Sequence, residues 1–311
     1  MRKGFTLIEM SIVLVIIGLI VGGVLVGRDL ISAAAVRAQI SQIEKYQTAV
    51  NTFHAKYGYL PGDIPDPTAS QYGFAARGNN PGEGDGNGVI EGPLGTASIG
   101  WLIFTGESGA FWADLSQANL INGGFTAGAS NILSQPIVVS QTQVANYLPP
   151  AKLGQGNYIA VWSGGWQLFA AMDIGGAAPD QKNYFSISSV VGCGVANGLA
   201  YTNVGMSVAQ AYSIDKKIDD GLPQSGRVLA LNNPGLNAGW AIGGQNSATG
   251  ANGMGANDGN DGPVIPGDGI STAPTADTCY DNSSVAGGVE KYSMSQNGGA
   301  GLNCALSLQF Q

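Results

Sequence analysis

Residues 1–30 read MRKGFTLIEMSIVLVIIGLIVGGVLVGRDL, and the apolar run from Phe5 to Val26 contains one acid, Glu9. As a helix rising about 1.5 Å per residue, this run is long enough to cross a hydrocarbon core about 30 Å thick. Arg2 and Lys3 precede it, so the positive-inside rule predicts a cytoplasmic N-terminus and an outward remainder. A secretory signal peptide fits poorly, because the run is long and no Ala-x-Ala cleavage site follows it. We therefore expect a membrane-spanning helix.

The helical pattern continues beyond the membrane span. No proline occurs before Pro61, and apolar residues recur at spacings of three, four and seven, at Val36, Ile40, Ile43, Val50, Phe53 and Tyr57. The other face carries polar residues, namely Arg37, Gln39, Gln42, Glu44, Lys45 and Thr48. The sequence predicts one helix, membrane-spanning over residues 5–27 and amphipathic over 28–58, with Gly58 as its C-terminal cap.

Glu9 raises a separate question, because a charge within a membrane span needs a partner. Cleavage between Gly4 and Phe5 would supply one, since the new α-amino group of Phe5 is cationic and lies four residues from Glu9. The two groups could meet within one helix. They could also meet between neighbouring chains that are staggered along a common axis. The pair would then fix the axial position of one chain relative to the next.

The segment Arg2-Lys3-Gly4 followed by Phe5-Thr6-Leu7-Ile8-Glu9 resembles the N-terminus of type IV prepilins and type II secretion pseudopilins. The resemblance covers about the first 60 residues, because Tyr46–Tyr59 is also similar to the end of a pseudopilin stalk helix. It implies that a prepilin peptidase removes residues 1–4 after Gly4 and methylates the new N-terminus, Phe5. It also implies that Glu9 pairs with the terminal amine of a neighbouring subunit during filament assembly.

The same resemblance implies the partners and the location. The partners would be prepilin peptidase, other pilin or pseudopilin subunits and the inner-membrane assembly machinery. The precursor would cross the bacterial inner membrane once, with its N-terminus cytoplasmic and its head periplasmic, before it enters a pilus or pseudopilus.

Residues 59–311 are expected to form a globular head. The chain contains 49 glycines, which favours long loops around a small regular core. Beyond Tyr57 there are 7 Lys and Arg against 18 Asp and Glu, so this part carries 7 − 18 = −11. Such a head is a poor electrostatic partner for nucleic acid and a suitable one for divalent cations. Residues 61–99 and the Gly/Asn-rich insert 232–277 are expected to be loops.

The remaining pattern predicts an α+β head. Helices are expected at 109–121, capped by Ser108, and at 207–220; strands are expected at 137–144, 158–162, 184–191 and 228–231. A turn at Trp162–Trp166 would lead into residues 167–171. Together these elements predict a pilin-like fold, in which an antiparallel sheet packs on the outer half of the long N-terminal helix.

One loop has the composition of a calcium site. In Glu83-Gly-Asp85-Gly-Asn87-Gly-Val-Ile-Glu91, oxygen ligands alternate with glycines, which allows several side chains to converge on one hard cation. The loop departs from an EF-hand because position twelve is Leu94 and not a glutamate. A solvated acidic turn is the alternative, and no other cofactor is expected. A second acidic stretch, 257–262, is a weaker calcium candidate, and Asx-turns explain it without a metal.

Three cysteines are too few for a disulfide scaffold. Cys279 and Cys304 would form a disulfide near the C-terminus if the compartment is oxidising. Cys193 is then left over and is expected to be a small buried apolar residue. At the end of the 207–220 helix, a solvated cluster is expected from Asp215, Lys216, Lys217, Asp219 and Asp220. Neutralisation of its carboxylates by Arg227 or a cation is the alternative.

The motifs do not indicate an enzyme. The single histidine, His54, falls on the polar side of the predicted stalk helix, and no phosphate loop, nucleophile elbow or zinc signature occurs. The expected function is therefore structural: a subunit of a type IV pilus or type II secretion pseudopilus. A minor tip pilin that binds a surface, a substrate or DNA through its enlarged head is the alternative. A secreted enzyme with a retained anchor is a third, more distant possibility.

Overall fold

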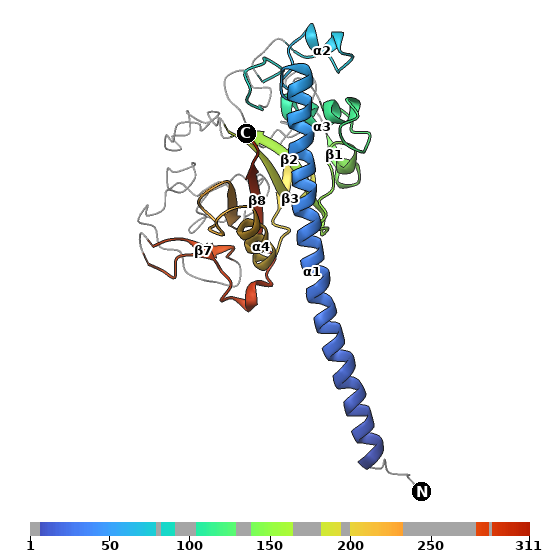
Figure 1. Cartoon of the computed structure of the whole chain (residues 1–311), viewed down its shortest axis with the longest axis vertical. Coiled ribbons are helices and arrows are strands. Elements are labelled where there is room, and N and C mark those ends of the chain that lie inside the picture. Colours follow the sequence, from blue (N-terminus) through green and yellow to red (C-terminus); the bar gives the residue numbers. More distant parts are fainter. Residues whose placement is uncertain are drawn as a thin grey trace.

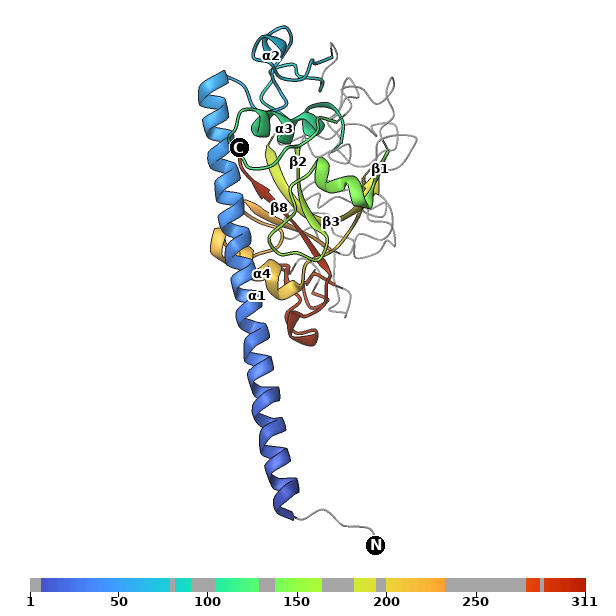
Figure 2. The same ribbon diagram turned by 90° about the vertical axis from the view of Figure 1, so that its right-hand side faces the viewer.

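The computed structural model describes residues 7–78, 82–90, 104–128, 138–163, 182–193, 200–232, 278–285 and 288–311. Its longest element is a single helix, α1 (Leu7–Tyr57), of 51 residues. At about 1.5 Å per residue, α1 is roughly 77 Å long. The head packs along the C-terminal half of α1, and the N-terminal half projects away from it (Figures 1 and 2). The predicted long helix and α+β architecture are confirmed.

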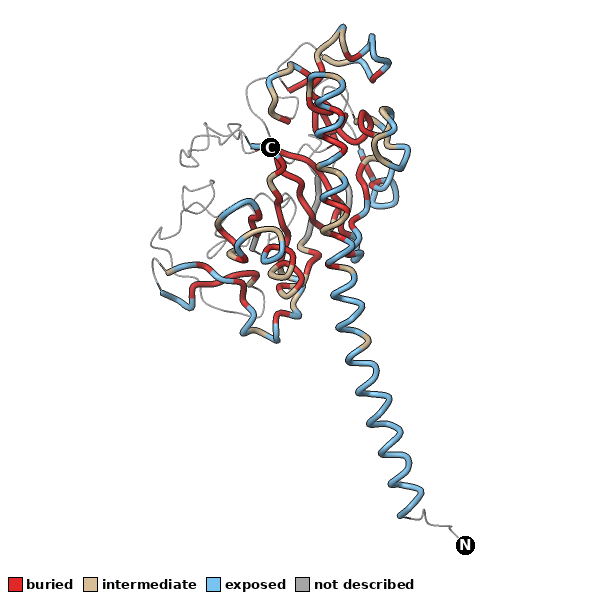
Figure 3. The backbone as a smooth tube through the Cα atoms, viewed as in Figure 1, coloured by how far each residue is buried: buried red, intermediate tan, exposed pale blue. Residues whose placement is uncertain are grey.

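The two halves of α1 differ sharply in burial (Figure 3). Residues 7–34 are exposed except for the half-buried Gly27, whereas Val36, Ile43, Val50 and Phe53 are buried against the head. The apolar stripe that predicts an amphipathic outer half is therefore the stripe that packs. Gly58 ends the helix in the left-handed conformation (φ 82°), as the sequence predicts.

The expectation that Gln39 and Gln42 lie on the solvent face is wrong. Both are buried, because their amides bind the backbone of a loop that crosses α1. Gln39 Oε1 accepts from the Leu153 amide at 3.3 Å, and Gln42 Oε1 accepts from the Lys152 amide at 3.0 Å. Gln42 Nε2 donates to the Pro150 carbonyl at 3.0 Å. Two glutamines thus fix this loop to the helix.

An antiparallel sheet of six strands forms the centre of the head. Its strands are β1 (Val139–Ser140), β2 (Asn157–Ser163), β3 (Asn183–Cys193), β4 (Ala200–Asn203), β5 (Val228–Asn232) and β8 (Cys304–Gln309). Strand β8 lies between β3 and β5. Strands β1 and β2 pair with the opposite edge of β3, and β4 pairs with the C-terminal part of β3 on the same edge as β8. The predicted strands at 158–162, 184–191 and 228–231 correspond to β2, β3 and β5.

Both faces of the central strands are covered, and some of their buried polar side chains are paired, although within the described residues the Ser163 and Ser188 hydroxyls are not. The hydroxyls of Ser186 and Ser307 lie 3.1 Å apart on β3 and β8, and Trp162 Nε1 donates to Ser307 Oγ at 3.1 Å. On the α1 side, the Trp112 and Phe185 rings stack with centroids 6.0 Å apart. Such pairing is needed because an unpaired buried polar group costs about 1–3 kcal/mol.

The helices of the head are α3 (Gly106–Gln117) and α4 (Val208–Ile218), with shorter turns α2 (Thr68–Gln71), η1 (Gln141–Asn146) and η3 (Asn297–Gly299). Helix α4 has the predicted start: Ser207 and Gln210 form a capping box. Helix α3 begins earlier than predicted, because the chain is extended at Thr105 and Ser108 is already inside the first turn. It also ends earlier, since Asn119 adopts a left-handed φ of 58°.

Two loop and strand expectations also need correction. The strand predicted at 137–144 is only the two-residue β1, because the Gln143 side chain accepts from the Ser140 amide and turns the chain into η1. Within the described parts of 61–99, the chain forms α2 and buries Ile64, Phe74 and Ile90, so this segment is not a simple extended loop. Of the predicted turn Trp162–Trp166, the first two residues belong to β2, and residue 232 of the predicted insert 232–277 ends β5. The rest of both segments and residues 167–171 lie outside the described residues.

Candidate functional site

The N-terminal half of α1, residues 7–34, is the most unusual surface of the described chain, and we call it the bare half-helix. Large apolar side chains along it are well exposed; Leu7 is 89% and Ile31 72% accessible. By length and composition, α1 can cross a membrane. So much apolar surface requires lipid or a protein partner, since monomers in water rarely expose contiguous apolar patches above a few hundred Å².

Glu9 lies in the first turn of α1, and its side chain is exposed. An acid suits this position, because the amide groups at a helix N-terminus carry partial positive charge. Gly4 and Phe5, the predicted cleavage and methylation residues, lie outside the described residues. Their roles and that of Glu9 in assembly stay predictions.

The loop from Gly82 to Ile90 folds over two buried acids that sequence analysis did not select, Asp63 and Glu107. Asp63 Oδ1 accepts from the Gly86 amide at 2.7 Å and Oδ2 from the Gly88 amide at 2.8 Å. Glu107 Oε1 accepts from the Gly84 amide at 2.9 Å. The three glycines have φ between 78° and 95°, which residues with a Cβ rarely adopt. The alternating glycines therefore serve to aim backbone amides at the two carboxylates.

Three carboxylates meet at this loop. Oxygens of Asp63, Asp85 and Glu107 lie within 4.8 Å of one another, with Asp85 exposed and the other two buried. Burial raises the pKa of Asp63 to about 6; the Gly88 and Gly86 amides oppose this shift, and Asp85 adds to it. Such a group of oxygens could hold a hard cation, as predicted for this loop.

Of the four calcium ligands predicted from the sequence, the described part of the structure brings only Asp85 to the three-carboxylate group. Asp85 joins the three-carboxylate group, but Glu83 is not part of it, and Glu91 lies outside the described residues. Asn87 is exposed and bonds within its own turn, to Asp85 and to the Val89 amide. Calcium binding stays a prediction, and its ligand set in the described chain would centre on Asp63, Asp85 and Glu107.

A buried ion pair lies beside this loop. Arg77 Nη2 donates to Asp114 Oδ2 at 2.5 Å, and the Gly62 amide donates to the same oxygen at 2.7 Å. Both side chains are almost inaccessible. Burial raises the pKa of Asp114, and the Arg77 charge and hydrogen bond act against this rise. The pair fixes the segment 62–77 on α3.

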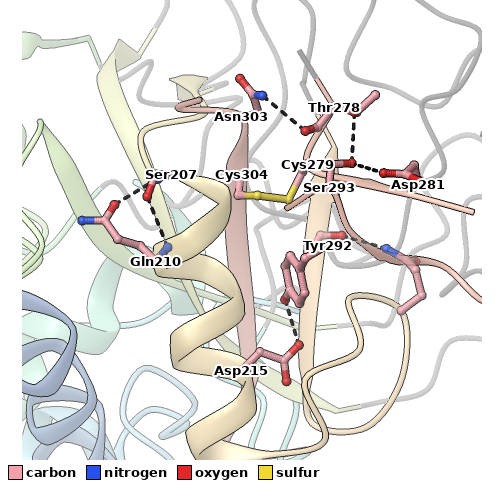
Figure 4. The surroundings of a disulfide bond; sticks show 12 residues. Ser207, Gln210, Asp215, Thr278, Cys279, Asp281, Tyr292, Ser293, Asn303 and Cys304 are labelled. Atoms are coloured by element: carbon pink, nitrogen blue, oxygen red, sulfur yellow. Dashed lines mark hydrogen bonds between the residues drawn. A yellow bond between two sulfur atoms is a disulfide. The ribbon is translucent and has the colours of Figure 1, made fainter. Parts of the chain in front are cut away.

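The disulfide predicted between Cys279 and Cys304 is confirmed, with the two Cα atoms 5.0 Å apart (Figure 4). It joins the start of β8 to a hairpin of two short strands, β6 (Tyr280–Asp281) and β7 (Lys291–Tyr292). Cys193 ends β3, and its side chain is outside the described part of the structure.

The exposure of His54 and of the acids at the end of α4 was also predicted from the sequence. His54 is exposed on α1, as predicted. The acidic cluster at the end of α4, which was expected to be solvated, is only partly exposed. Asp220 is exposed and Asp219 is half-buried, but Asp215 is fully buried. It is buried because the β6–β7 hairpin covers it, which local sequence does not reveal.

A bare apolar half-helix that carries an α+β head defines a membrane-anchored, pilin-like architecture. The family model of the prokaryotic N-terminal methylation motif matches residues 1–25, so the chain carries a prepilin-type cleavage and methylation segment. The motif supports a type IV pilin-like or pseudopilin-like protein and favours a structural protein over an enzyme. No curated protein and no solved structure matches the chain.

Proposed function

We propose that the protein is a structural subunit of a type IV pilus or of a type II secretion pseudopilus. The observation that carries this proposal is the methylation motif over residues 1–25, which precedes and overlaps the bare half-helix. In the membrane, lipid covers the apolar surface of residues 7–27. In the filament, the corresponding helices of neighbouring subunits replace the lipid.

The proposed topology has the N-terminus in the cytoplasm and the head in the periplasm. Arg2 and Lys3 favour it, because positive residues before a span remain on the cytoplasmic side. The Cys279–Cys304 disulfide supports the same orientation, since disulfides persist in oxidising compartments such as the periplasm. In this topology the head folds and forms its disulfide in the periplasm before the subunit leaves the membrane.

In this proposal prepilin peptidase cleaves after Gly4 and methylates Phe5. The Phe5 amine of one subunit then pairs with Glu9 of its neighbour and fixes the register of the stack. A charge in hydrocarbon is costly, and the amine of a neighbouring subunit would offset this cost for Glu9 in the assembled filament.

Processing and assembly can be tested separately in cells that carry the whole export system. Gly4→Ala is expected to leave the N-terminal peptide at its precursor mass. Glu9→Ala is expected to be inserted and cleaved normally but to be lost from purified filaments. Glu44→Ala is the matched control, because Glu44 is an exposed acid on the outer half of the same helix. Filaments that incorporate Glu9→Ala as well as the control would refute the pairing role.

A minor tip subunit is the second candidate, favoured by the length of the head, residues 59–311, relative to the stalk. A filament body needs many copies of a subunit, and a tip needs very few. Quantitative mass spectrometry of purified filaments distinguishes them. A copy number near that of the most abundant subunit supports the filament body, and a few copies per filament support the tip.

A further inference from the structure

The C-terminal end of α4 holds three carboxylates that neither the methylation motif nor filament assembly explains. Oxygens of Asp215, Asp219 and Asp220 lie within 4.8 Å of one another. Carboxylates in the last turn of a helix are unfavourable, because the unpaired carbonyls there carry partial negative charge. Asp215 is the buried member, and no ion pair to it occurs within the described part of the chain.

Asp215 is also the polar link between α4 and the C-terminal hairpin. Its Oδ2 accepts from the Tyr292 hydroxyl of β7 at 2.8 Å, and its Oδ1 accepts from the Gly221 amide at 3.1 Å (Figure 4). The Tyr292 ring packs edge-on against Tyr212 of α4, with centroids 5.8 Å apart. The other two carboxylates bind the turn 220–228 instead: Asp219 accepts from the Arg227 amide, and Asp220 from the Leu222 amide.

The surroundings supply little positive charge to Asp215. Helix α4 packs on α1, β5, β7, β8 and η3. The cations on or next to these elements are exposed, and the guanidinium of Arg227 donates to the Gln309 carbonyl. These cations are Arg28, Arg37, Lys45, Lys56, Lys216, Lys217, Arg227 and Lys291. The remaining titratable groups are the exposed His54 and a set of acids and phenols, namely Glu9, Asp29, Glu44, Tyr46, Tyr57, Tyr212, Asp219, Asp220, Tyr280, Asp281, the buried Glu290 and Tyr292. β8 and η3 contribute no titratable side chain.

We propose that the Asp215–Tyr292 contact is a pH-responsive clasp that holds the disulfide-linked β6–β7 hairpin on α4 when Asp215 is protonated and loosens when Asp215 ionises. A protonated Asp215 can keep both hydrogen bonds without adding charge. An ionised Asp215 accepts these hydrogen bonds more strongly, but it is then a charge buried away from water and next to Asp219 and Asp220, and this cost exceeds the gain from the two bonds. The disulfide then limits the movement, because Cys279 stays tied to β8 while the Tyr292 side of the hairpin opens.

The pH range follows from the environment of Asp215. Burial raises its pKa to about 7, against the lowering effect of the Tyr292 and Gly221 hydrogen bonds, and Asp220 and Asp219 raise it further. The folded protein therefore holds a proton on Asp215 that the unfolded chain releases near pH 4. Between pH 4 and 7 the folded state binds more protons, so stability falls as pH rises, and it levels off above pH 7.

The test uses the full chain in detergent micelles. From pH 5.5 to 8, the unfolding equilibrium constant of the head attributable to Asp215 is expected to rise on the order of 30-fold. Hydrogen exchange, corrected for intrinsic rates, is expected to accelerate over this range in peptides covering 288–303. Asp215→Asn should remove both responses, because an amide does not titrate. A wild-type pH response in Asp215→Asn, or unchanged exchange of 288–303 in the wild type, would overturn the proposal.

Two further variants keep the proposal testable if Asp215→Asn fails to fold. Asp220→Asn removes an exposed charge that raises the pKa of Asp215, so the response should move to lower pH. Tyr292→Phe removes a hydrogen bond that favours ionised Asp215, so exchange of 288–303 should be faster already at pH 5.5 and the response should move to higher pH. Midpoints that stay at the wild-type pH in both variants contradict the clasp.

Discussion

Asp114 and Arg77 show how this head buries charge. The pair is almost inaccessible, and Asp114 receives two donors on one oxygen. A buried ion pair contributes little net stability, because desolvation offsets most of the attraction, but removal of one partner leaves the other charge uncompensated. The pair therefore acts as a geometric constraint on where segment 62–77 meets α3.

Arg77→Met should accordingly destabilise the head by about 3–5 kcal/mol, because Asp114 is left as a buried charge. Urea unfolding followed by tryptophan fluorescence measures this loss. The double variant Arg77→Met/Asp114→Asn is the matched control and should recover a large part of it. A single variant as stable as the wild type would show that the pair is not buried as described.

The three carboxylates at the loop 82–90 lead to a second prediction at the scale of residues. If Asp63, Asp85 and Glu107 take up calcium, Ca²⁺ at 100 times its Kd should stabilise the head by about 2.7 kcal/mol, and a chelator should reverse this. Asp85→Asn removes the exposed ligand and leaves the two buried ligands, Asp63 and Glu107, in place, so it should abolish the calcium effect. Glu44→Gln, with the same change of charge on the outer half of α1, should retain it. Equal melting temperatures of the wild type in Ca²⁺ and in chelator would identify an acidic turn without metal.

At the scale of elements, α1 is hydrogen-bonded through two side chains to the loop 150–153. Apolar packing at Val36, Ile43 and Phe53 is tolerant of small rotations, whereas hydrogen bonds are directional. The amides of Gln39 and Gln42 therefore fix the rotational position of the helix relative to the head. In a filament, this rotational position would decide how the head is oriented around the axis of the bare half-helix.

Gln42→Leu should cost about 1–3 kcal/mol, because the Lys152 amide and the Pro150 carbonyl lose their partner. Gln47→Leu is the matched control, since Gln47 is half-buried and makes no side-chain hydrogen bond within the described residues. Thermal unfolding compares the two variants, and an equal loss in both would show that the amide contacts add nothing to packing.

At the scale of the whole molecule, the bare half-helix and the head are structurally independent. Residues 7–34 are exposed apart from the half-buried Gly27, so they contribute almost no packing to the head. A chain that lacks residues 1–34 should therefore remain monomeric without detergent and unfold within a few degrees of the full chain. Size-exclusion chromatography and calorimetry check both points. A truncated chain that aggregates or unfolds much earlier would show that the half-helix supports the fold.

The sequence allowed prediction of features that depend on neighbouring residues. The apolar spacing and the absence of proline before Pro61 predicted α1, and Ser207 marked the start of α4. Features that depend on distant segments were missed. Strand β8 forms because it pairs with β3, which lies more than 100 residues earlier in the chain. Asp63 and Glu107 come together only because both bind the loop that lies between them in sequence. Gln39 and Gln42 were misplaced because their partners are backbone groups about 110 residues away.

The position of β8 has a consequence for the timing of biogenesis. It is the last strand of the sheet along the chain, yet it lies between β3 and β5. The membrane helix has therefore been synthesised long before the sheet can close. At about 5–20 residues per second, the interval between residue 28 and residue 304 is roughly 14–55 s. During that time the nascent head is anchored but incomplete, and its exposed core strands are open to chaperones and to proteolysis.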